Sequence, residues 1–414
     1  MAVIKPFKGI RPAPDKVHLV ASRPVETYNT DELDSKLKEN PYSFLHIIKP
    51  DFNSKQKSKP GSAELLEKIK SKFNSFNNEG IFIQDNQECL YVYSQEKNGH
   101  SNTGIIGCAS IDDYINGVIK IHEQTLTHKE ETLKEYLEIC DFNAEPVCLT
   151  YPPDKEINEI IKIITKTQPV YDFSTTNKKR HKLWLVNNPT MIKTIVASFN
   201  AKPAIYIADG HHRSASSALL GRAKRKHFKN FSGQEPFNFF MAIYFSEDQV
   251  EILDFNRVVK DLNGLTDVEF LQKISLNFKV EEKGTQIHKP NKLHNFSMYL
   301  SGKWYDLNAL EGTFNKKDST SVLDASILSD NLLSPVLGIE DLRKDKRVNF
   351  ISGILGLDEI KKQVDSGKMK VGFALFPVTM DQLKAVADDG KSMPPKSTWI
   401  EPKLRNGLTI YSLS

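Results

Sequence analysis

The sequence predicts an α+β protein built on mixed β-sheets. Short apolar, β-prone runs alternate along the chain with segments of helical periodicity. The runs at residues 81–83, 89–93 and 105–110 are separated only by Asn- and Gly-rich turns, which is typical of an antiparallel sheet. Later runs are separated by helical segments, a rhythm that favours additional α/β layers.

Length and charge limit the class of protein. The 414 residues exceed one average domain, and we expect three regions: an N-terminal α+β region at 1–110, a core at 111–260 and a C-terminal α/β region at 261–414. The 39% hydrophobic and 26% charged residues are ordinary for a globular protein. A net charge of +4 is small for this length, so a nucleic-acid partner is not expected.

Cysteine usage and the N-terminus indicate a compartment. The four cysteines, at positions 89, 108, 140 and 148, form no CxxC pair and no zinc spacing, so neither disulfides nor a zinc site are expected. The N-terminus carries no apolar leader, and no apolar run reaches membrane-spanning length. We expect a cytoplasmic protein with no membrane contact, and the sequence leaves its oligomeric state open.

In the first half of the chain, helices are expected at 31–39 with Thr30 as N-cap, at 63–76, in the second half of the segment 110–140, at 155–167 and at 188–200. The helix before Cys140 carries Leu133 and Leu137 on the same stripe, and Pro189 suits the first turn of a helix. Strands are expected at 44–48, 146–151, 181–186 and 205–208.

In the second half, strands are expected at 237–245, 250–255, 278–282, 296–300, 303–307 and 370–376. The nearly continuous apolar run at 237–245 suits a central sheet position, and Ser301-Gly302 predicts a hairpin turn. Helices are expected at 328–337, ended or kinked by Pro335, at 356–365 and at 379–387. Thr379 and Gln382 form a capping box for the last of these.

The stretch 204–220 reads AIYIADGHHRSASSALL and joins a buried strand to a helix through a tight Gly turn. Asp209-Gly210 ends the strand, since Gly adopts backbone angles that other residues resist. The exposed N–H groups of a helix start attract anions, and Arg213 adds a planar donor suited to phosphate. The sequence therefore indicates a phosphate site; the alternative is a plain strand–turn–helix corner with His211 and His212 on its surface.

Two further segments carry candidate chemistry. His122-Glu123 ends an apolar run, and such a carboxylate can act as a general base, although a surface pair or helix cap has the same pattern. It is not an HExxH zinc motif, because the position of a second histidine is not occupied by one. Near the C-terminus, the Pro-rich loop around Lys396, Ser397 and Thr398 is dense in polar donors of the kind that hold ligands.

Together these pieces, which read IKIHEQT, IADGHHRS and MPPKSTW, resemble the ParB/sulfiredoxin-like superfamily and, within it, the free L-serine kinases. The whole chain is also similar to a large bacterial family of unknown function related to ParB, through the hallmarks NPYSFLHIIKP, GVIKIHEQT, YIADGHHR, LGIEDLRKDKRV and MPPKSTWIEPKLRNGL. The resemblance implies a ParB/sulfiredoxin-like nucleotide-binding core with further α/β elaborations.

The resemblance also implies an activity: transfer of a phosphoryl group from ATP or ADP, with Mg2+, to the hydroxyl of free L-serine, giving O-phosphoserine. Glu123 would be the base, with His122 beside it. Asp209 would act in catalysis, as a magnesium ligand or as an orienting acceptor. Gly210, His211, His212 and Arg213 would bind nucleotide phosphate, and Lys396, Ser397 and Thr398 would bind serine.

Departures from the pattern leave alternatives open. Many members of the bacterial family carry Pro-Tyr-Asp where this chain reads Arg23-Pro24-Val25-Glu26, so a role for that Asp does not transfer. Sulfiredoxin has a catalytic Cys where this chain has His211, so sulfinic acid reduction is not expected. The alternatives are a non-catalytic nucleotide- or DNA-binding module, or a kinase for another small hydroxyl substrate.

Overall fold

A computed structural model describes residues 1–228 and 230–414, with the side chain of Glu26 excluded, and shows a mixed α/β protein. Backbone contacts divide it into two compact units. Unit 1 comprises Met1–Ile121, Thr125–Val250 and Pro402–Ser414, so the chain returns to it at its C-terminal end. Unit 2 comprises His122–Gln124 and Glu251–Glu401.

Unit 1 is built on a nine-stranded mixed sheet with the order β6-β11-β8-β12-β5-β4-β10-β9 and with β1 paired to β5. The pairs β6–β11 and β8–β12 are parallel and the others antiparallel. Strand β12 is buried along its whole length, as expected for an apolar run in a central position. The strands are β1 (Ile4–Lys5), β4 (Leu90–Lys97), β5 (His100–Ser110), β6 (Ile119–Lys120), β8 (Val147–Tyr151), β9 (Tyr171–Ser174), β10 (Arg180–Val186), β11 (Ile205–Asp209) and β12 (Phe239–Ser246).

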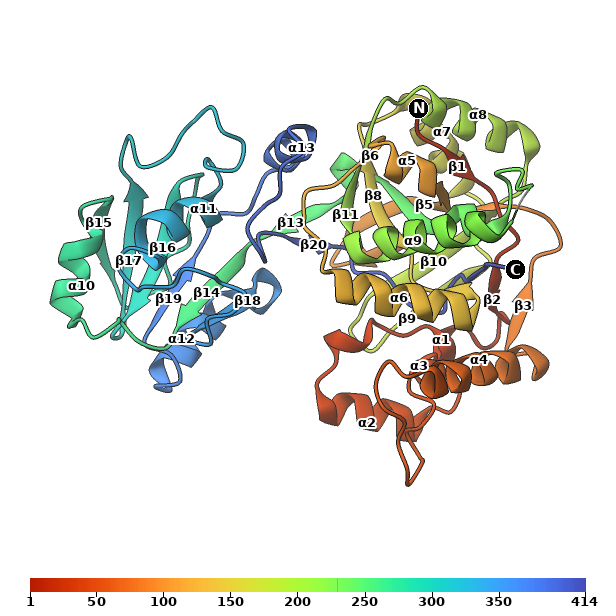
Figure 1. Ribbon diagram of the computed structural model, residues 1–414, viewed down its shortest axis with the longest axis horizontal. Helices are drawn as coiled ribbons and strands as arrows, with labels where there is room; N and C mark the ends of the chain where they lie inside the picture. The colour runs from red at the N-terminus through yellow and green to blue at the C-terminus, as the bar shows by residue number, and fades with distance from the viewer. Residues whose placement is uncertain (229) are drawn as a thin grey trace. The chain divides into compact units, whose positions relative to one another are not determined.

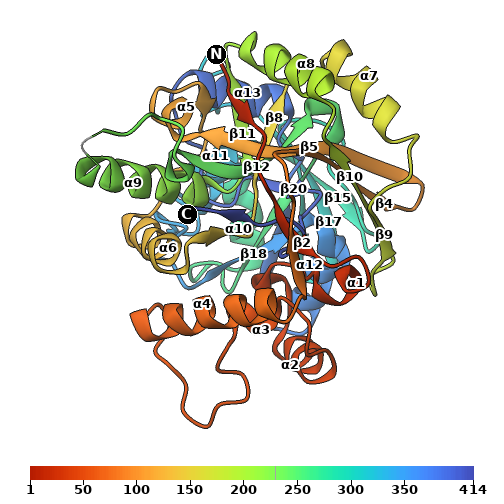
Figure 2. The same ribbon diagram turned by 90° about the vertical axis from the view of Figure 1, so that its right-hand side faces the viewer.

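Helices cover both faces of this sheet (Figures 1 and 2). Helices α7 (Lys155–Ile164) and α8 (Pro189–Asn200) lie on one side, and their apolar residues join the core of the sheet. Helices α6 (Thr127–Cys140) and α9 (His211–His227) lie side by side on the other. The remaining helices are α1 (Val17–Val20), α2 (Thr30–Glu39), α3 (Leu45–Ile48), α4 (Ala63–Asn78) and α5 (Ile111–Ile115).

Two short antiparallel pairs complete the strands of unit 1. They are β2 (Ile10–Pro12) with β3 (Phe82–Gln84), and β7 (Phe142–Asn143) with β21 (Tyr411–Ser412). A second apolar core joins Phe73 and Phe76 of α4 to Phe142 and to Ile410 of the returning segment. The C-terminal residues are therefore part of the packing of unit 1.

Unit 2 contains a six-stranded antiparallel sheet with the order β15-β17-β16-β19-β14-β18. Its two faces pack into separate apolar cores, so that neighbouring Val258 and Val259 point to opposite sides. Its strands are β13 (Glu251–Leu253), β14 (Phe255–Val259), β15 (Phe278–Gly284), β16 (Asn295–Leu300), β17 (Lys303–Ala309), β18 (Val348–Ser352), β19 (Val371–Ala374) and β20 (Trp399–Glu401), where β13 pairs with β20. Its α-helices are α10 (Asp267–Ile274), α11 (Asp324–Leu328), α12 (Gly356–Asp365) and α13 (Met380–Asp388), and α11 runs into a π-helix, η4 (Ser329–Leu333).

Several expected elements are corrected by the structure. Residues 45–48 form helix α3 rather than a strand, because their apolar side chains pack against α4 and not within a sheet. The expected helix at 328–337 begins at Asp324 and ends before Pro335, and the expected strand at 250–255 is split into β13 and β14. The N-cap of α2 is Asn29 instead of Thr30.

The two units also differ from the three expected regions. β5, from the expected N-terminal region, pairs with β12, from the expected core, along seven residue pairs that run from Phe239 to Phe245. Strands from residues 1–110 and from the expected core therefore share one sheet, and both regions belong mostly to unit 1.

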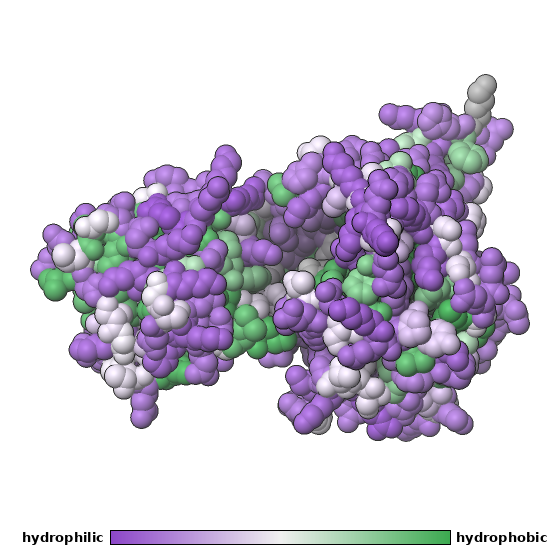
Figure 3. Space-filling model, turned by 90° about the horizontal axis from the view of Figure 1, so that it is seen from below, coloured by the Kyte–Doolittle hydropathy of each residue, from purple (hydrophilic) through white to green (hydrophobic). Residues whose placement is uncertain are grey.

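Hydrophilic residues predominate on the face drawn in Figure 3, with hydrophobic residues scattered between them. Among the described residues, no helix combines the length and apolar character needed to cross a membrane. All four cysteines are buried, and each is a free thiol in the structure.

Candidate functional site

The Gly210 turn connects β11 to α9 in unit 1. Ile205 to Ala208 are buried in the sheet, and the helix begins directly at His211. Gly210 has φ 106° and occupies the N-cap position, where no side-chain hydrogen bond caps the helix. A Cβ added at Gly210 would lie 3.1 Å from the guanidinium carbon of Arg213. Glycine therefore suits this position twice, because it adopts the positive φ and because it leaves room for the Arg213 side chain.

Asp209 is held between two cations. Its Oδ2 accepts a hydrogen bond of 2.7 Å from Nη2 of Arg213, and its Oδ1 accepts one of 3.2 Å from Nζ of Lys403. Nη1 of Arg213 also donates to the carbonyl oxygen of Pro146 at 2.6 Å. Both carboxylate oxygens are therefore occupied, and we call Asp209, Arg213 and Lys403 the Asp209 cluster.

The electrostatics of the cluster favour an ionised Asp209. Its burial alone would raise the pKa, but Arg213 and Lys403 outweigh that effect and hold the pKa of Asp209 below its usual value. Glu145 lies 3.6 Å from Nη1 of Arg213 as a second, longer ion pair. Two cations thus lie beside the positive end of the α9 dipole, an arrangement that attracts anions.

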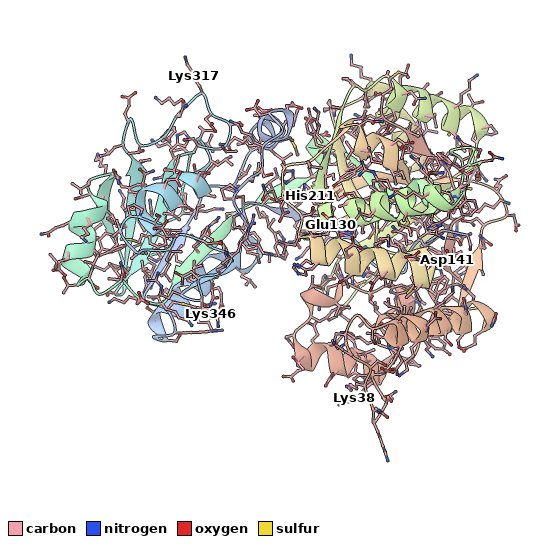
Figure 4. All side chains as sticks on the ribbon, in the orientation of Figure 1. Lys38, Glu130, Asp141, His211, Lys317 and Lys346 are labelled. Atoms are coloured by element: carbon pink, nitrogen blue, oxygen red, sulfur yellow. The ribbon has the colours of Figure 1, made fainter. Side chains whose placement is uncertain are left out.

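The two histidines after Gly210 differ in their surroundings. His211, labelled in Figure 4, is 4% exposed, whereas His212 is half-buried. Burial lowers the pKa of His212, with Lys129 adding to this effect and Glu130 of α6 opposing it. Among the described residues, Nδ1 of His212 has no hydrogen-bond partner. His212 is therefore a neutral donor or acceptor at the start of α9 at neutral pH.

A small cavity adjoins Arg213. It has a volume of about 240 Å³ and is lined by Arg213 and Ser216 together with apolar side chains that include Phe44, Tyr136 and Leu137. Asn143, Glu145 and Asn406 also line it, so the guanidinium borders a space with mostly apolar walls and a few polar groups.

The other predicted site residues belong to unit 2. The carbonyl of His122 accepts a hydrogen bond of 2.8 Å from the N–H of Met393, which links the His-Glu segment to the loop that precedes Lys396. The His122 side chain is buried and that of Glu123 is exposed.

The loop itself has a defined conformation. Lys396 has φ 56° and places its Nζ 5.4 Å from the ring centre of Phe255. The hydroxyl of Ser397 donates to the carbonyl of Pro394 at 2.7 Å, and Thr398 is half-buried. Unit 2 therefore brings the segment of Glu123 and the loop of Lys396 together, whereas the Asp209 cluster is formed within unit 1.

Sequence reasoning missed Lys403 as a member of the cluster and Glu145 as a further partner of Arg213. Lys403 belongs to the stretch EPKLRNG, part of the hallmark MPPKSTWIEPKLRNGL. A basic residue in a hallmark loop was the only available signal, because 194 residues separate Lys403 from Asp209.

A protein-built metal site is not found within residues 1–228 and 230–414: no group of three or more His, Cys, Asp or Glu side chains could hold an ion there. Asp209, the expected magnesium ligand, already pairs with two cations. The described side chains therefore do not form a site for a resident metal ion.

Comparisons with known proteins give a family and distant structural relatives. A family profile described as "Protein of unknown function (DUF1015)" matches residues 4–326. No curated protein matches the sequence significantly.

Among solved structures, a free serine kinase in complex with AMP is 14% identical with a TM-score of 0.37, covering 72% of this chain and 88% of that one. A conserved hypothetical protein from Pyrococcus furiosus is 13% identical with a TM-score of 0.37, covering 74% and 95%. SbnI with a C-terminal truncation from Staphylococcus aureus is 12% identical with a TM-score of 0.39, covering 72% and 82%.

Proposed function

The chain belongs to the DUF1015 family of proteins of unknown function, and we propose that it is a small-molecule kinase that uses a nucleotide as phosphoryl donor. The Asp209 cluster carries this proposal. Phosphoryl transfer requires cations and N–H donors around the donor phosphates and a positioned nucleophile. Arg213, Lys403 and the start of α9 supply such groups, and Asp209 orients the two cations.

The nucleotide would bind with its phosphates at Gly210, His211, His212 and Arg213. The cavity beside Arg213 supports this placement, because its mostly apolar walls suit a flat nucleobase. Magnesium would arrive with ATP or ADP as part of the substrate, since the described side chains do not form a site for a resident ion.

The acceptor we propose is free L-serine, a choice supported by the sequence resemblance to free L-serine kinases. Its hydroxyl oxygen attacks the terminal phosphorus, and the bond from that phosphorus to the bridging oxygen breaks with the electron pair left on the nucleotide. The hydroxyl proton passes to the Glu123 carboxylate, an exposed group on a segment anchored through His122. General-base assistance of this kind contributes roughly 10²- to 10⁴-fold in rate.

The loop of Lys396, Ser397 and Thr398 would hold the serine carboxylate through one cation and two hydroxyl groups. The hydrogen bond between Met393 and His122 supports this assignment, because it ties the acceptor loop to the segment that carries the base. The reaction requires the base, the acceptor loop and the Asp209 cluster to act on the same substrates.

The test incubates the full-length protein with L-serine, Mg2+ and either ATP or ADP, and detects O-phosphoserine by mass spectrometry. We expect product with one of the two donors and at least a hundredfold slower formation by Glu123→Gln, with nucleotide affinity retained. The exposed neighbour variant Gln124→Ala is the matched control. No product with either donor would rule out the serine kinase, and salt-sensitive DNA binding without turnover would favour the non-catalytic module.

A further inference from the structure

A polar cavity in unit 1 has no role in the proposed reaction. Its volume is about 520 Å³, within the range of small-molecule sites, and its lining includes none of the residues of the Asp209 cluster. The lining comes from residues 18–45, from the turn at 174–177 and from Arg405 in the returning C-terminal segment. Asn40, Ser43 and Leu45 of this lining lie in the hallmark stretch NPYSFLHIIKP, and Arg405 lies in MPPKSTWIEPKLRNGL; the proposed kinase gives Arg405 no role.

Arg405 is a buried cation, and none of the described carboxylates pairs with it. The residue is 8% exposed, and its Nη2 donates to Oγ1 of Thr175 at 3.0 Å and to Oδ1 of Asn177 at 3.1 Å. Both acceptors are neutral. Burial lowers the pKa of Arg405, and the repulsion of Arg23 acts in the same direction. A buried charge is normally compensated by an opposite charge, and within the described part of the chain Arg405 has only these neutral hydrogen-bond partners.

The wall next to Arg405 carries further donors. Ser22 and Asn406 exchange two backbone hydrogen bonds, of 3.2 and 2.8 Å, which fixes the segment of Arg405 beside Ser22 and Arg23. The buried hydroxyl of Ser22 has no hydrogen-bond partner among the described residues. Arg23 lies over the ring of Tyr28 at 4.1 Å and pairs with Glu32.

The charge of the lining is unbalanced. Arg23, Lys36 and Arg405 face the cavity, and among the described side chains its one carboxylate, Glu32, is already paired with Arg23. The cavity therefore has an excess of positive charge at the position where Arg405 lacks a counter-ion.

We propose that this cavity binds a small organic anion whose carboxylate or phosphate group pairs with Arg405 and Arg23. The oxyanion receives the guanidinium donors that Thr175 and Asn177 leave unused, and the Ser22 hydroxyl provides another hydrogen bond. This site is separate from the nucleotide site, and the proposal stands whether or not the chain is a kinase.

The experiment uses the full-length protein in calorimetric titrations with two sets of probes. One set consists of carboxylates, succinate and citrate; the other consists of inorganic phosphate and glycerol phosphate. We expect one set to bind with a dissociation constant below about 1 mM, and Arg405→Met to weaken that binding at least tenfold. Lys162→Met should bind it as the wild type does, because that variant removes only an exposed charge outside the cavity.

Arg23→Met provides an independent variant, since Arg23 is more exposed than Arg405, and we expect it to weaken binding three- to tenfold. Circular dichroism checks that each variant is folded. If Arg405→Met does not fold, the affinity of Arg23→Met for the anion tests the proposal instead. The proposal is overturned if neither set binds the wild type, or if the folded Arg405 or Arg23 variant binds as tightly as the wild type.

Discussion

Gly210 shows how one residue sets the geometry of the candidate site. Its positive φ turns the chain from β11 into α9, and the absence of a Cβ leaves room for the Arg213 guanidinium. Gly210→Ala should lower the free energy of unfolding by about 1–2 kcal/mol and displace Arg213, so that nucleotide affinity also falls.

The matched control is Gly117→Ala, at a glycine with φ 73° and no atom within 4 Å of an added Cβ. Gly117→Ala should be less stable than the wild type only because alanine disfavours a positive φ. It should bind nucleotide as the wild type does. Urea unfolding and nucleotide titration of the two variants measure both effects. Equal nucleotide affinity in Gly210→Ala and Gly117→Ala would contradict the proposed dependence on Arg213.

Asp209 holds the second key position, because its charge orients Arg213 and Lys403. Since its folded pKa lies below the unfolded value, its contribution to stability is present above the unfolded pKa and is lost as the pH falls through the folded pKa. Asp209→Asn should therefore be less stable than the wild type at pH 7, by about 1 kcal/mol or less for this partly exposed group. The difference should shrink below pH 4, which thermal unfolding as a function of pH can check; a difference that stays constant would exclude the electrostatic role.

Among the elements, α11 of unit 2 carries a buried acid. Asp324 is 3% exposed, and its Oδ1 accepts a hydrogen bond of 2.9 Å from the N–H of His294. Its Oδ2 has no partner among the described residues, and neither do Nε and Nη2 of the buried Arg257. Burial raises the pKa of Asp324 to about 7, although the N–H groups of His294 and Phe376 and the charge of Arg257 oppose this.

This raised pKa makes the stability of unit 2 depend on pH. The contribution of Asp324 is fully present below the unfolded pKa near 3.8 and is lost as the pH rises towards 7. The stability of Asp324→Asn relative to the wild type should therefore increase between pH 5 and pH 7, by on the order of 2 kcal/mol. Urea unfolding followed by tryptophan fluorescence measures it, since Trp304 and Trp399 lie in unit 2. The exposed Asp358→Asn should show no such increase; an increase equal to that of Asp324→Asn would refute the assignment.

Elements with a strong local signal were predicted well. The capping box at Thr379 and Gln382 begins α13, Asn188 and Pro189 begin α8, and Ser301-Gly302 joins β16 to β17. Residues 44–48 were predicted wrongly, because a short apolar run has no distinguishable period and only the contact with α4 decides its structure.

At the scale of the whole molecule, the returning C-terminal segment completes unit 1. Ile410 is fully buried, and it exchanges hydrogen bonds of 2.9 and 2.7 Å with Ile10. Ile410→Ala should lower the free energy of unfolding of unit 1 by about 2–5 kcal/mol, and Ile410→Val by about 0.5–1.5 kcal/mol. Urea unfolding gives both values, and a loss below 1 kcal/mol for Ile410→Ala would show that the segment is not an integral part of the core.

The same segment explains why the candidate site was only partly predictable. The DGHHR turn is contiguous, so its strand, its turn and its arginine could be found from local sequence. Lys403 reaches Asp209 only because the chain returns to unit 1 after passing through unit 2, and such a long-range contact leaves no local pattern. Arg405 was hidden in the same way.

The central claim is that the Asp209 cluster binds nucleotide phosphates. Isothermal titration of the full-length protein with adenosine, AMP, ADP and ATP measures this most directly, together with the variants Arg213→Met and Lys403→Met. The account predicts that affinity rises at least tenfold from adenosine to the preferred phosphorylated form, and that both variants lose most of this gain while still binding adenosine. Equal affinity for adenosine and its phosphates, or wild-type affinity for ADP and ATP in both variants, would contradict it.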